Sequence, residues 1–208
     1  MFKRMFKHQK FDIEIRRGVD PSKLGWPTND QTGSDSGFGC NRAYEDLTGR
    51  SWVDARTVFE LERDLISKIE SEYESLDEES FESELLNAEM YLDGLDLGVA
   101  ATVIALSAVG CVPFSSCNAG AFGGDHQERY PLVAYYAPSN AVELILSAAA
   151  EAEIGLDGGD YLVAYADDIR KLSAFAWALI KRAATFNALR ARSKETKAKA
   201  HPRNPDFQ

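Results

Sequence analysis

Apolar residues at helical spacing dominate the first half of the chain. Between Val58 and Leu76 they recur every three or four positions, which predicts a helix with one apolar face. Ser51 and Asp54 precede this run with the spacing of a capping box, so we expect the helix to begin there. The opposite face carries several carboxylates and is expected to be solvated.

A second helical repeat runs from Phe81 to Leu106 with constant spacing, and we expect it to form one long helix that ends at Gly110. Residues 97–124 contain no charged side chain, and an uncharged stretch of that length raises the question of a membrane span. However, the stretch is rich in Ala, Gly and Ser, and Pro113 interrupts it. We therefore predict a helix buried in a protein core.

The remaining elements are expected to be strands and helices in alternation. A helix that begins at Ser139 or Asn140 separates two apolar segments, and we expect those two segments to be parallel strands joined by a right-handed crossover. A last long helix, capped by Asp167 or Asp168, is expected to reach Phe186. Strand-like patterns occupy residues 11–15, 111–120, 131–137 and 161–166.

Together these elements predict a mixed α/β (α+β) fold. We expect a small three- to four-stranded sheet, a predominantly helical N-terminal half and a long C-terminal helix. Residues 1–44 are expected to form a basic segment with a strand and a polar loop, because Gly, Pro, Ser, Asn and Asp are frequent in residues 20–41. Residues 45–190 then form a single mainly helical domain, and residues 191–208 a basic, flexible tail.

The formal net charge of −10 is unevenly distributed along the chain. Residues 45–96 carry 17 acidic and 4 basic side chains, a net charge of −13, whereas both ends of the chain are basic. An acidic helical surface of this kind either keeps the protein soluble or docks a basic partner. The candidate partner-binding residues are Glu60, Asp64, Glu70, Glu74, Asp77, Glu78 and Glu79.

This acidity also indicates which classes of partner the protein can bind. Proteins that bind nucleic acid carry excess positive charge, so nucleic acid is disfavoured except through the basic tail at residues 190–203. A basic protein, such as a toxin, a nuclease or another subunit, or a second copy of the chain fits better. Three cysteines and the lack of an apolar signal segment favour a cytoplasmic protein with free thiols and no membrane association.

Residues 111–130 contain the side chains that are best suited to catalysis. In an extended segment His126 and Glu128 share a face, and a hairpin would bring them near Cys117. A thiol beside an imidazole is a nucleophile with its base, and Asn118 could stabilise an oxyanion. The alternative is that the cysteines are buried strand residues and that the loop is a polar turn.

The sequence contains no phosphate-binding loop, dinucleotide-binding motif, standard zinc motif or nucleophile elbow, and implies no cofactor. We therefore expect a soluble acidic protein that acts by binding a protein partner, as an inhibitor, an immunity-type protein or a subunit of an assembly. The rival hypothesis is a thiol- or metal-dependent hydrolase centred on Cys117, His126 and Glu128.

Overall fold

The structure, a computed structural model, describes residues 10–32, 45–72, 76–122 and 128–200. Within these residues five strands form one mixed sheet in the order β1-β4-β5-β3-β2. The mixed α/β prediction is thus confirmed, but the sheet is larger than the three or four strands expected. The strands are β1 (Arg17–Gly18), β2 (Val112–Cys117), β3 (Leu132–Tyr136), β4 (Gly155–Gly158) and β5 (Leu162–Tyr165).

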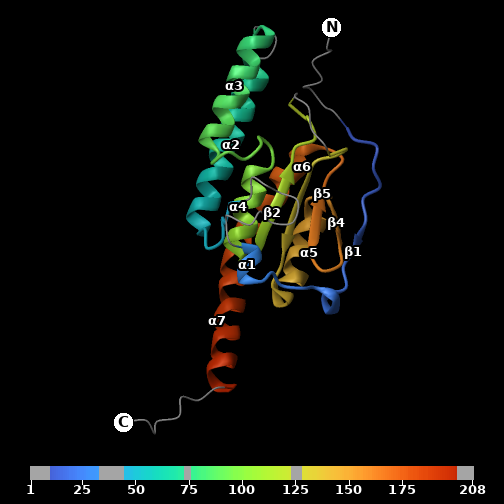
Figure 1. Cartoon of the computed structure of the whole chain (residues 1–208), viewed down its shortest axis with the longest axis vertical. Helices are drawn as coiled ribbons and strands as arrows, with labels where there is room; N and C mark the ends of the chain where they lie inside the picture. The colour runs from blue at the N-terminus through green and yellow to red at the C-terminus, as the bar shows by residue number, and fades with distance from the viewer. Residues whose placement is uncertain (1–9, 33–44, 73–75, 123–127, 201–208) are drawn as a thin grey trace.

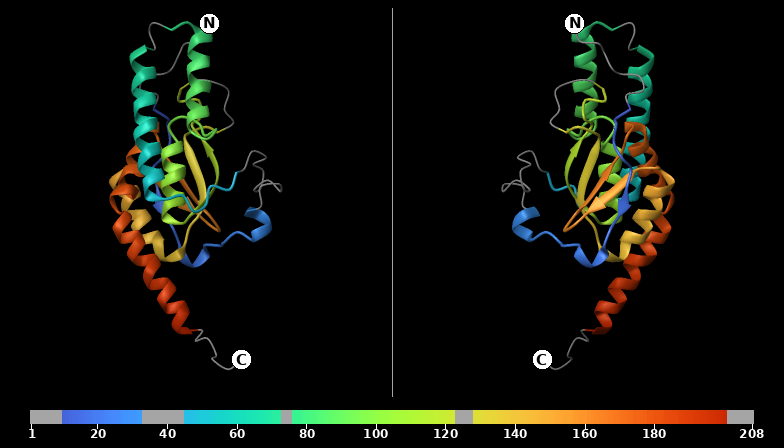
Figure 2. Two further views of the ribbon diagram at one scale, coloured as in Figure 1. Left: turned by 90° about the vertical axis from the view of Figure 1, so that its left-hand side faces the viewer. Right: turned by 90° about the vertical axis from the view of Figure 1, so that its right-hand side faces the viewer.

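The helices lie on one side of this sheet. Helices α4 and α5 pack directly on its strands, α6 packs against both of them, and α2 covers α4 and α6. The α2–α3 hairpin extends beyond the sheet at one end of the molecule and α7 at the other (Figures 1 and 2). The main helices are α2 (Trp52–Glu72), α3 (Glu78–Tyr91), α4 (Ala100–Val109), α5 (Val142–Glu151), α6 (Ile169–Lys181) and α7 (Ala183–Ala200). Shorter helices are η1 (Pro21–Lys23), α1 (Asn29–Thr32) and η3 (Ser139–Ala141).

The predicted parallel pair of strands is wrong, because β3 and β5 are antiparallel. The glycine-rich residues 155–160, for which the sequence pattern predicts no strand, contain strand β4, and β4 forms a hairpin with β5. Both β3 and β4 run antiparallel to β5, so the crossover through α5 joins two parallel strands with β5 inserted between them. Glycine is a poor strand former, which is why the pattern concealed β4.

The N-terminal strand is also displaced from its expected position. Residues 11–15 alternate between half-buried and exposed side chains, as their pattern predicts, but they do not join the sheet ladder. Only Arg17 and Gly18 pair with β4, as a parallel edge strand. The preceding residues are held instead by single contacts, such as the hydrogen bond of 2.8 Å from the Phe11 N–H to the Asp167 carbonyl.

The long helix predicted from Phe81 to Leu106 is in fact two helices, α3 and α4. Asp93, Gly94 and Gly98 adopt positive φ angles of 57°, 75° and 93°, which no helix residue adopts, and the helix is broken there. The apolar spacing continues through this turn because Leu92 and other turn residues are buried like helix residues. Side-chain periodicity therefore could not reveal the break. The last helix is likewise divided at Arg182 into α6 and α7, and α7 extends to Ala200 in the segment expected to be a flexible tail.

The helix ends show which capping predictions hold. The Ser51 N–H donates to Asp54 Oδ2 at 2.7 Å and the Asp54 N–H to Ser51 Oγ at 3.2 Å, which confirms the capping box of α2. Asp168 caps α6 by accepting from the Arg170 N–H at 3.0 Å. In contrast, α5 follows a short 3-10 turn and has no side-chain cap at its N-terminus.

Helix α4 is the centre of the core, and all ten of its residues are buried. It packs against α2, α6 and strand β2, so apolar neighbours surround it. This is the burial predicted for the uncharged stretch of the sequence. No helix in the described ranges has both the length and the apolarity needed to cross a bilayer.

A buried glutamate closes the N-terminus of α4. Glu62, which is fully buried in the middle of α2, accepts hydrogen bonds at Oε1 from the N–H groups of Gly98 at 3.0 Å and Ala101 at 3.4 Å. Val99, which occupies the N-cap position of α4, makes no capping hydrogen bond with its own side chain. Burial dominates over these hydrogen bonds and raises the pKa of Glu62 from 4.5 to about 7. A side chain on Gly98 would collide with Ile169, because an added Cβ would lie 2.5 Å from Ile169 Cγ1.

An arginine closes the C-terminus of α4. Arg190, on helix α7, donates from Nη2 to the Ala108 carbonyl at 2.5 Å and from Nε to the Val109 carbonyl at 3.1 Å. Gly110 ends the helix in the left-handed conformation with φ of 100°, as predicted, and an added Cβ there would lie 2.7 Å from Arg190 Nη2. A hydrogen-bond acceptor at the N-terminus and a positively charged donor at the C-terminus satisfy the backbone groups that the ends of a helix leave free.

We predict that Glu62 makes stability fall as pH rises from about 4.5 to 7. The folded protein retains the proton over this interval and the unfolded chain loses it, so the unfolded state gains relative stability by about 3 kcal/mol at most. The variant Glu62→Gln, which resembles the neutral acid, should abolish this slope in urea unfolding measured across the interval. Glu60→Gln, which alters an exposed carboxylate on the same helix, is the matched control, and an unchanged slope in Glu62→Gln would refute the assignment.

We predict that Arg190→Met destabilises the fold by about 2 kcal/mol, because two buried carbonyl groups lose a charged hydrogen-bond donor. Chemical denaturation monitored by circular dichroism would measure the change. The control is Arg63→Met, since Arg63 forms only an exposed ion pair with Asp64 and such pairs contribute little. Equal effects of the two substitutions would show that Arg190 does not support α4.

Candidate functional site

The structure forms the hairpin predicted around Cys117, with Cys117 in β2 opposite Leu132 in β3. The thiol is half-buried, and its sulfur accepts hydrogen bonds from the backbone N–H groups of Ala119 and Glu128. Glu128 thus lies close to Cys117 in the fold, as predicted, although its recorded contact with the thiol is through the backbone. His126 lies outside the described residues, so the proposed thiol–imidazole pair stays a prediction.

Burial raises the pKa of the Cys117 thiol, and the negative charges of Asp96 and Glu128 add to this effect. The backbone hydrogen bonds to sulfur act in the opposite direction without reversing the shift. An activated cysteine shows a lowered pKa. The described surroundings of Cys117 therefore favour a neutral thiol over a thiolate.

Asn118 has a structural position in the same hairpin and is only 3% exposed. Its Nδ2 donates to the Leu97 carbonyl at 3.2 Å, its Oδ1 accepts from the Gly120 N–H at 2.9 Å, and its own N–H donates to Asp96 Oδ2 at 3.1 Å. These bonds fasten the end of β2 to the turn between α3 and α4. Both polar atoms of the amide are engaged in this attachment, so the proposed oxyanion-stabilising role of Asn118 has no support from its contacts.

The metal-binding alternative depends on the same segment. Cys117, His126 and Glu128 were the candidate ligands, and His126 lies outside the described residues. Among the described residues no three His, Cys, Asp or Glu side chains are grouped so that they could hold a metal ion. Cys111, which precedes β2, is fully buried, and burial raises the pKa of its thiol strongly.

The acidic candidate surface lies on the α2–α3 hairpin. Glu60, Asp64 and Glu70 on α2 and Asp77 and Glu79 at the start of α3 are exposed, whereas Glu74 and the side chain of Glu78 lie outside the described part. Two basic side chains of α2 form ion pairs with carboxylates of the same hairpin. Arg63 pairs with Asp64 at 3.3 Å and Lys68 with Glu84 at 2.8 Å on the same hairpin.

The outward face of α3 carries a feature that the sequence analysis missed. Leu86, Met90 and Tyr91 are 62%, 78% and 69% exposed, although large apolar residues are normally covered. The apolar repeat through Leu85, Ala88 and Leu92 forms the covered side of the helix. Leu86 and Met90 lie outside that repeat and are four residues apart. Large apolar residues at helical spacing outside the covered repeat were the sequence signal for an exposed apolar stripe.

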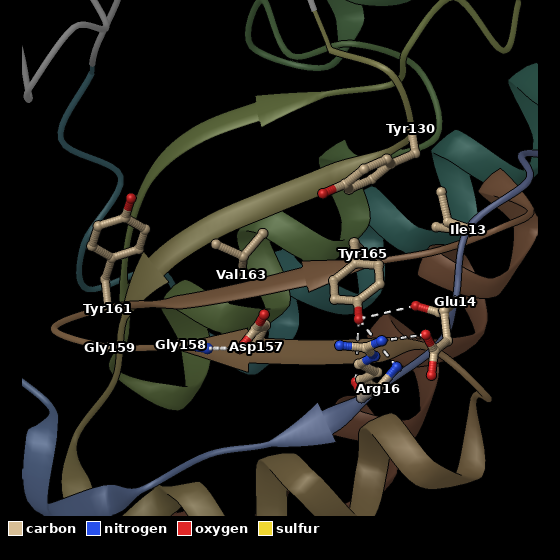
Figure 3. A pocket seen from close by; sticks show the side chains of 10 residues that line it. All are labelled: Ile13, Glu14, Arg16, Tyr130, Asp157, Gly158, Gly159, Tyr161, Val163 and Tyr165. Carbon is tan, nitrogen blue, oxygen red and sulfur yellow. Dashed lines mark hydrogen bonds and ion pairs between the residues drawn. The ribbon is translucent and has the colours of Figure 1, made fainter.

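A pocket of about 550 Å³ lies on the open face of the sheet, opposite the helices. Side chains along β5 alternate between the two faces: Leu162 and Ala164 are fully buried in the core, whereas Val163 and Tyr165 line the pocket. Figure 3 shows Tyr130 and Tyr161 on opposite sides of Val163. The volume is within the range of small-molecule binding sites. The other lining residues are Ile13, Glu14, Arg16, Asp157, Gly158 and Gly159.

Tyr165 connects the pocket to the N-terminal segment. Its hydroxyl accepts from the Arg16 N–H at 3.1 Å and lies 3.3 Å from the Glu14 carbonyl, to which it can donate (Figure 3). The ring rests over Gly155 in β4, where an added Cβ would lie 2.2 Å from Tyr165 Cζ. Gly155, which makes β4 hard to predict from the sequence, is therefore the residue that makes room for the ring of Tyr165.

No known family, no curated protein and no solved structure is similar to this chain by sequence or fold comparison.

We predict that Cys117 alkylates slowly at neutral pH. Its raised pKa leaves a smaller thiolate fraction than in a free thiol, so the rate with iodoacetamide should continue to rise above the pKa of an ordinary cysteine. Mass spectrometry of the Cys117 peptide across a pH series would provide the rates, with a short cysteine peptide as the reference. An inflection below the reference value would instead support a thiol nucleophile.

Proposed function

We propose that this protein acts by binding a basic protein partner through the outward face of the α2–α3 hairpin. The observation that carries this proposal is the exposure of Leu86, Met90 and Tyr91 on α3. Methionine and tyrosine are enriched in the centres of protein interfaces, where burial of large side chains provides most of the binding free energy. Covering these three side chains would remove a substantial apolar area from water.

The charge around this apolar stripe favours a basic partner. Glu79 and Glu82 are exposed on the same face of α3, one to two turns before Leu86. The segment at residues 45–96 has a net charge of −13, in which the basic partners of the described ion pairs are already counted, so most of its negative charge remains. A lysine- or arginine-rich helix with one apolar side matches both features, since its charges can meet the carboxylates while its apolar side covers the stripe.

The position of the hairpin supports the same function. It projects beyond the sheet, so a partner can approach α3 without contact with the rest of the domain (Figures 1 and 2). The basic end of the same chain is a weaker candidate for this partner, because Arg190 is bound to the end of α4. An inhibitor, an immunity-type protein or an assembly subunit would each use a surface of this kind.

Site-specific crosslinking tests this proposal. A photoreactive residue placed at Met90 should capture one basic protein in cells, whereas the same residue at Val53, which is 74% exposed at the start of α2, should not. Capture of a second copy of the chain would show that this face mediates self-association and does not bind a basic partner. Equal capture at the two positions, or capture of an acidic protein, would contradict the proposal.

We predict that the purified complex depends on both parts of the surface. Replacing Leu86, Met90 and Tyr91 by serine should weaken binding at least about tenfold through faster dissociation, because a central apolar contact is lost. Replacing Glu79 and Glu82 by lysine should slow association and reduce the salt dependence. Surface plasmon resonance at several ionic strengths would separate the two effects, and full binding by both variants would exclude this face of α3.

A further inference from the structure

The pocket on the open face of the sheet has aromatic walls at both ends. Phe114, Tyr136 and Tyr161 form one cluster, in which the ring centroids of Phe114 and Tyr161 are 5.0 Å apart and those of Tyr136 and Tyr161 are 5.9 Å apart. Tyr130 and Tyr165 form the opposite wall, with centroids 5.5 Å apart. Val163 lies between the two walls (Figure 3). A ligand bound over Val163 would therefore have aromatic rings at either end of the pocket.

Carboxylates outnumber cations around the same space. Arg16 and Glu14 form an ion pair, so their charges largely offset each other. Asp157 also lines the pocket, and within the described ranges it forms no ion pair, although it lies near enough to help raise the pKa of Arg16. Asp160 in the adjoining turn contributes further negative charge and helps raise the pKa of Tyr136. The pocket thus combines aromatic rings with uncompensated negative charge.

From this combination we infer that the pocket binds an organic cation, with an ammonium or guanidinium group over Val163, near Asp157 and the tyrosine rings that line the pocket. Cations are attracted to the faces of aromatic rings, and a carboxylate nearby strengthens that attraction. A phosphate or nucleic-acid ligand would be repelled by the same carboxylates. The cation belongs either to a free small molecule or to a lysine or arginine side chain.

The architecture keeps this site available. Tyr165 is held by its hydroxyl at the N-terminal segment and by the space above Gly155, so one wall is already in place before a ligand enters. Tyr161 is 41% exposed at the start of β5, which leaves its ring open to contact from solvent. The site faces away from the helices that form the core, and its occupation requires no opening of that core.

Titration with choline and with its uncharged isostere, in which carbon replaces the nitrogen, tests the inference. The two molecules have the same shape, so charge alone should make choline bind about tenfold more tightly at constant ionic strength. Heteronuclear NMR should show shifts at Tyr130, Tyr161 and Val163. Equal affinity for the two molecules, shifts located elsewhere, or no binding would overturn the inference.

Variants separate the two contributions to cation binding. Tyr161→Leu retains an apolar side chain but removes the aromatic ring, and Asp157→Asn removes the charge with little change of shape. Each should weaken choline binding about fivefold, and Glu143→Gln, an exposed substitution on α5, should not change it. Retained heteronuclear spectra would verify folding of each variant, and unchanged affinity in both folded pocket variants would refute the site.

The source of the cation is distinguished by comparing free arginine amide with an arginine residue flanked by glycines in a capped peptide. Tighter binding of the peptide would identify a protein side chain as the ligand, and tighter binding of the free amide a small molecule. Either result supports a cation site. This site does not depend on the α2–α3 hairpin, so failure of the partner-binding proposal would leave these outcomes unaffected.

Discussion

The fold depends on a helix that is buried along its whole length and capped at both ends by side chains of other helices. Helix α4 has no exposed residue, so its terminal N–H and C=O groups have limited access to water. Glu62 of α2 provides acceptors at one end and Arg190 of α7 provides donors at the other. Helices far apart in the sequence are thereby fastened to the same central element, and an uncharged stretch becomes the core of a globular domain.

This central packing leaves two surfaces with unusual side chains. The outward face of α3 exposes Leu86, Met90 and Tyr91 beside carboxylates, because its other face is covered by α2. The open face of the sheet presents tyrosines around a pocket, because the helices pack on the opposite face. The two surfaces belong to different elements, and neither includes the core around α4.

The candidate sites differ in how far local sequence could identify them. The carboxylates of the hairpin were identified because charge is a property of the residue itself, yet their pairing with Arg63 and Lys68 depends on the fold. The alternation of Tyr161, Val163 and Tyr165 was visible in the sequence. Tyr130 and Arg16 join them only because strand order brings distant segments together. Glu62 shows the same limit, because nothing adjacent to it in the sequence indicates that it is buried.

Interactions between residues close in the chain determined the helical stripes, the capping box at Ser51 and the stop at Gly110. The composition of the uncharged stretch indicated burial, and packing against α2, α6 and β2 provides it. Tertiary structure decided where the helices break. Leu92 is buried in a turn as it would be in a helix, so its place in the apolar repeat does not reveal the break. Tertiary structure also decided the strand order. The sequence of β4 has no strand pattern, yet β4 pairs with β5, where Gly155 leaves room for the ring of Tyr165. Contacts between distant residues leave no periodic pattern in the sequence, and the pocket on the open face of the sheet is formed by such contacts.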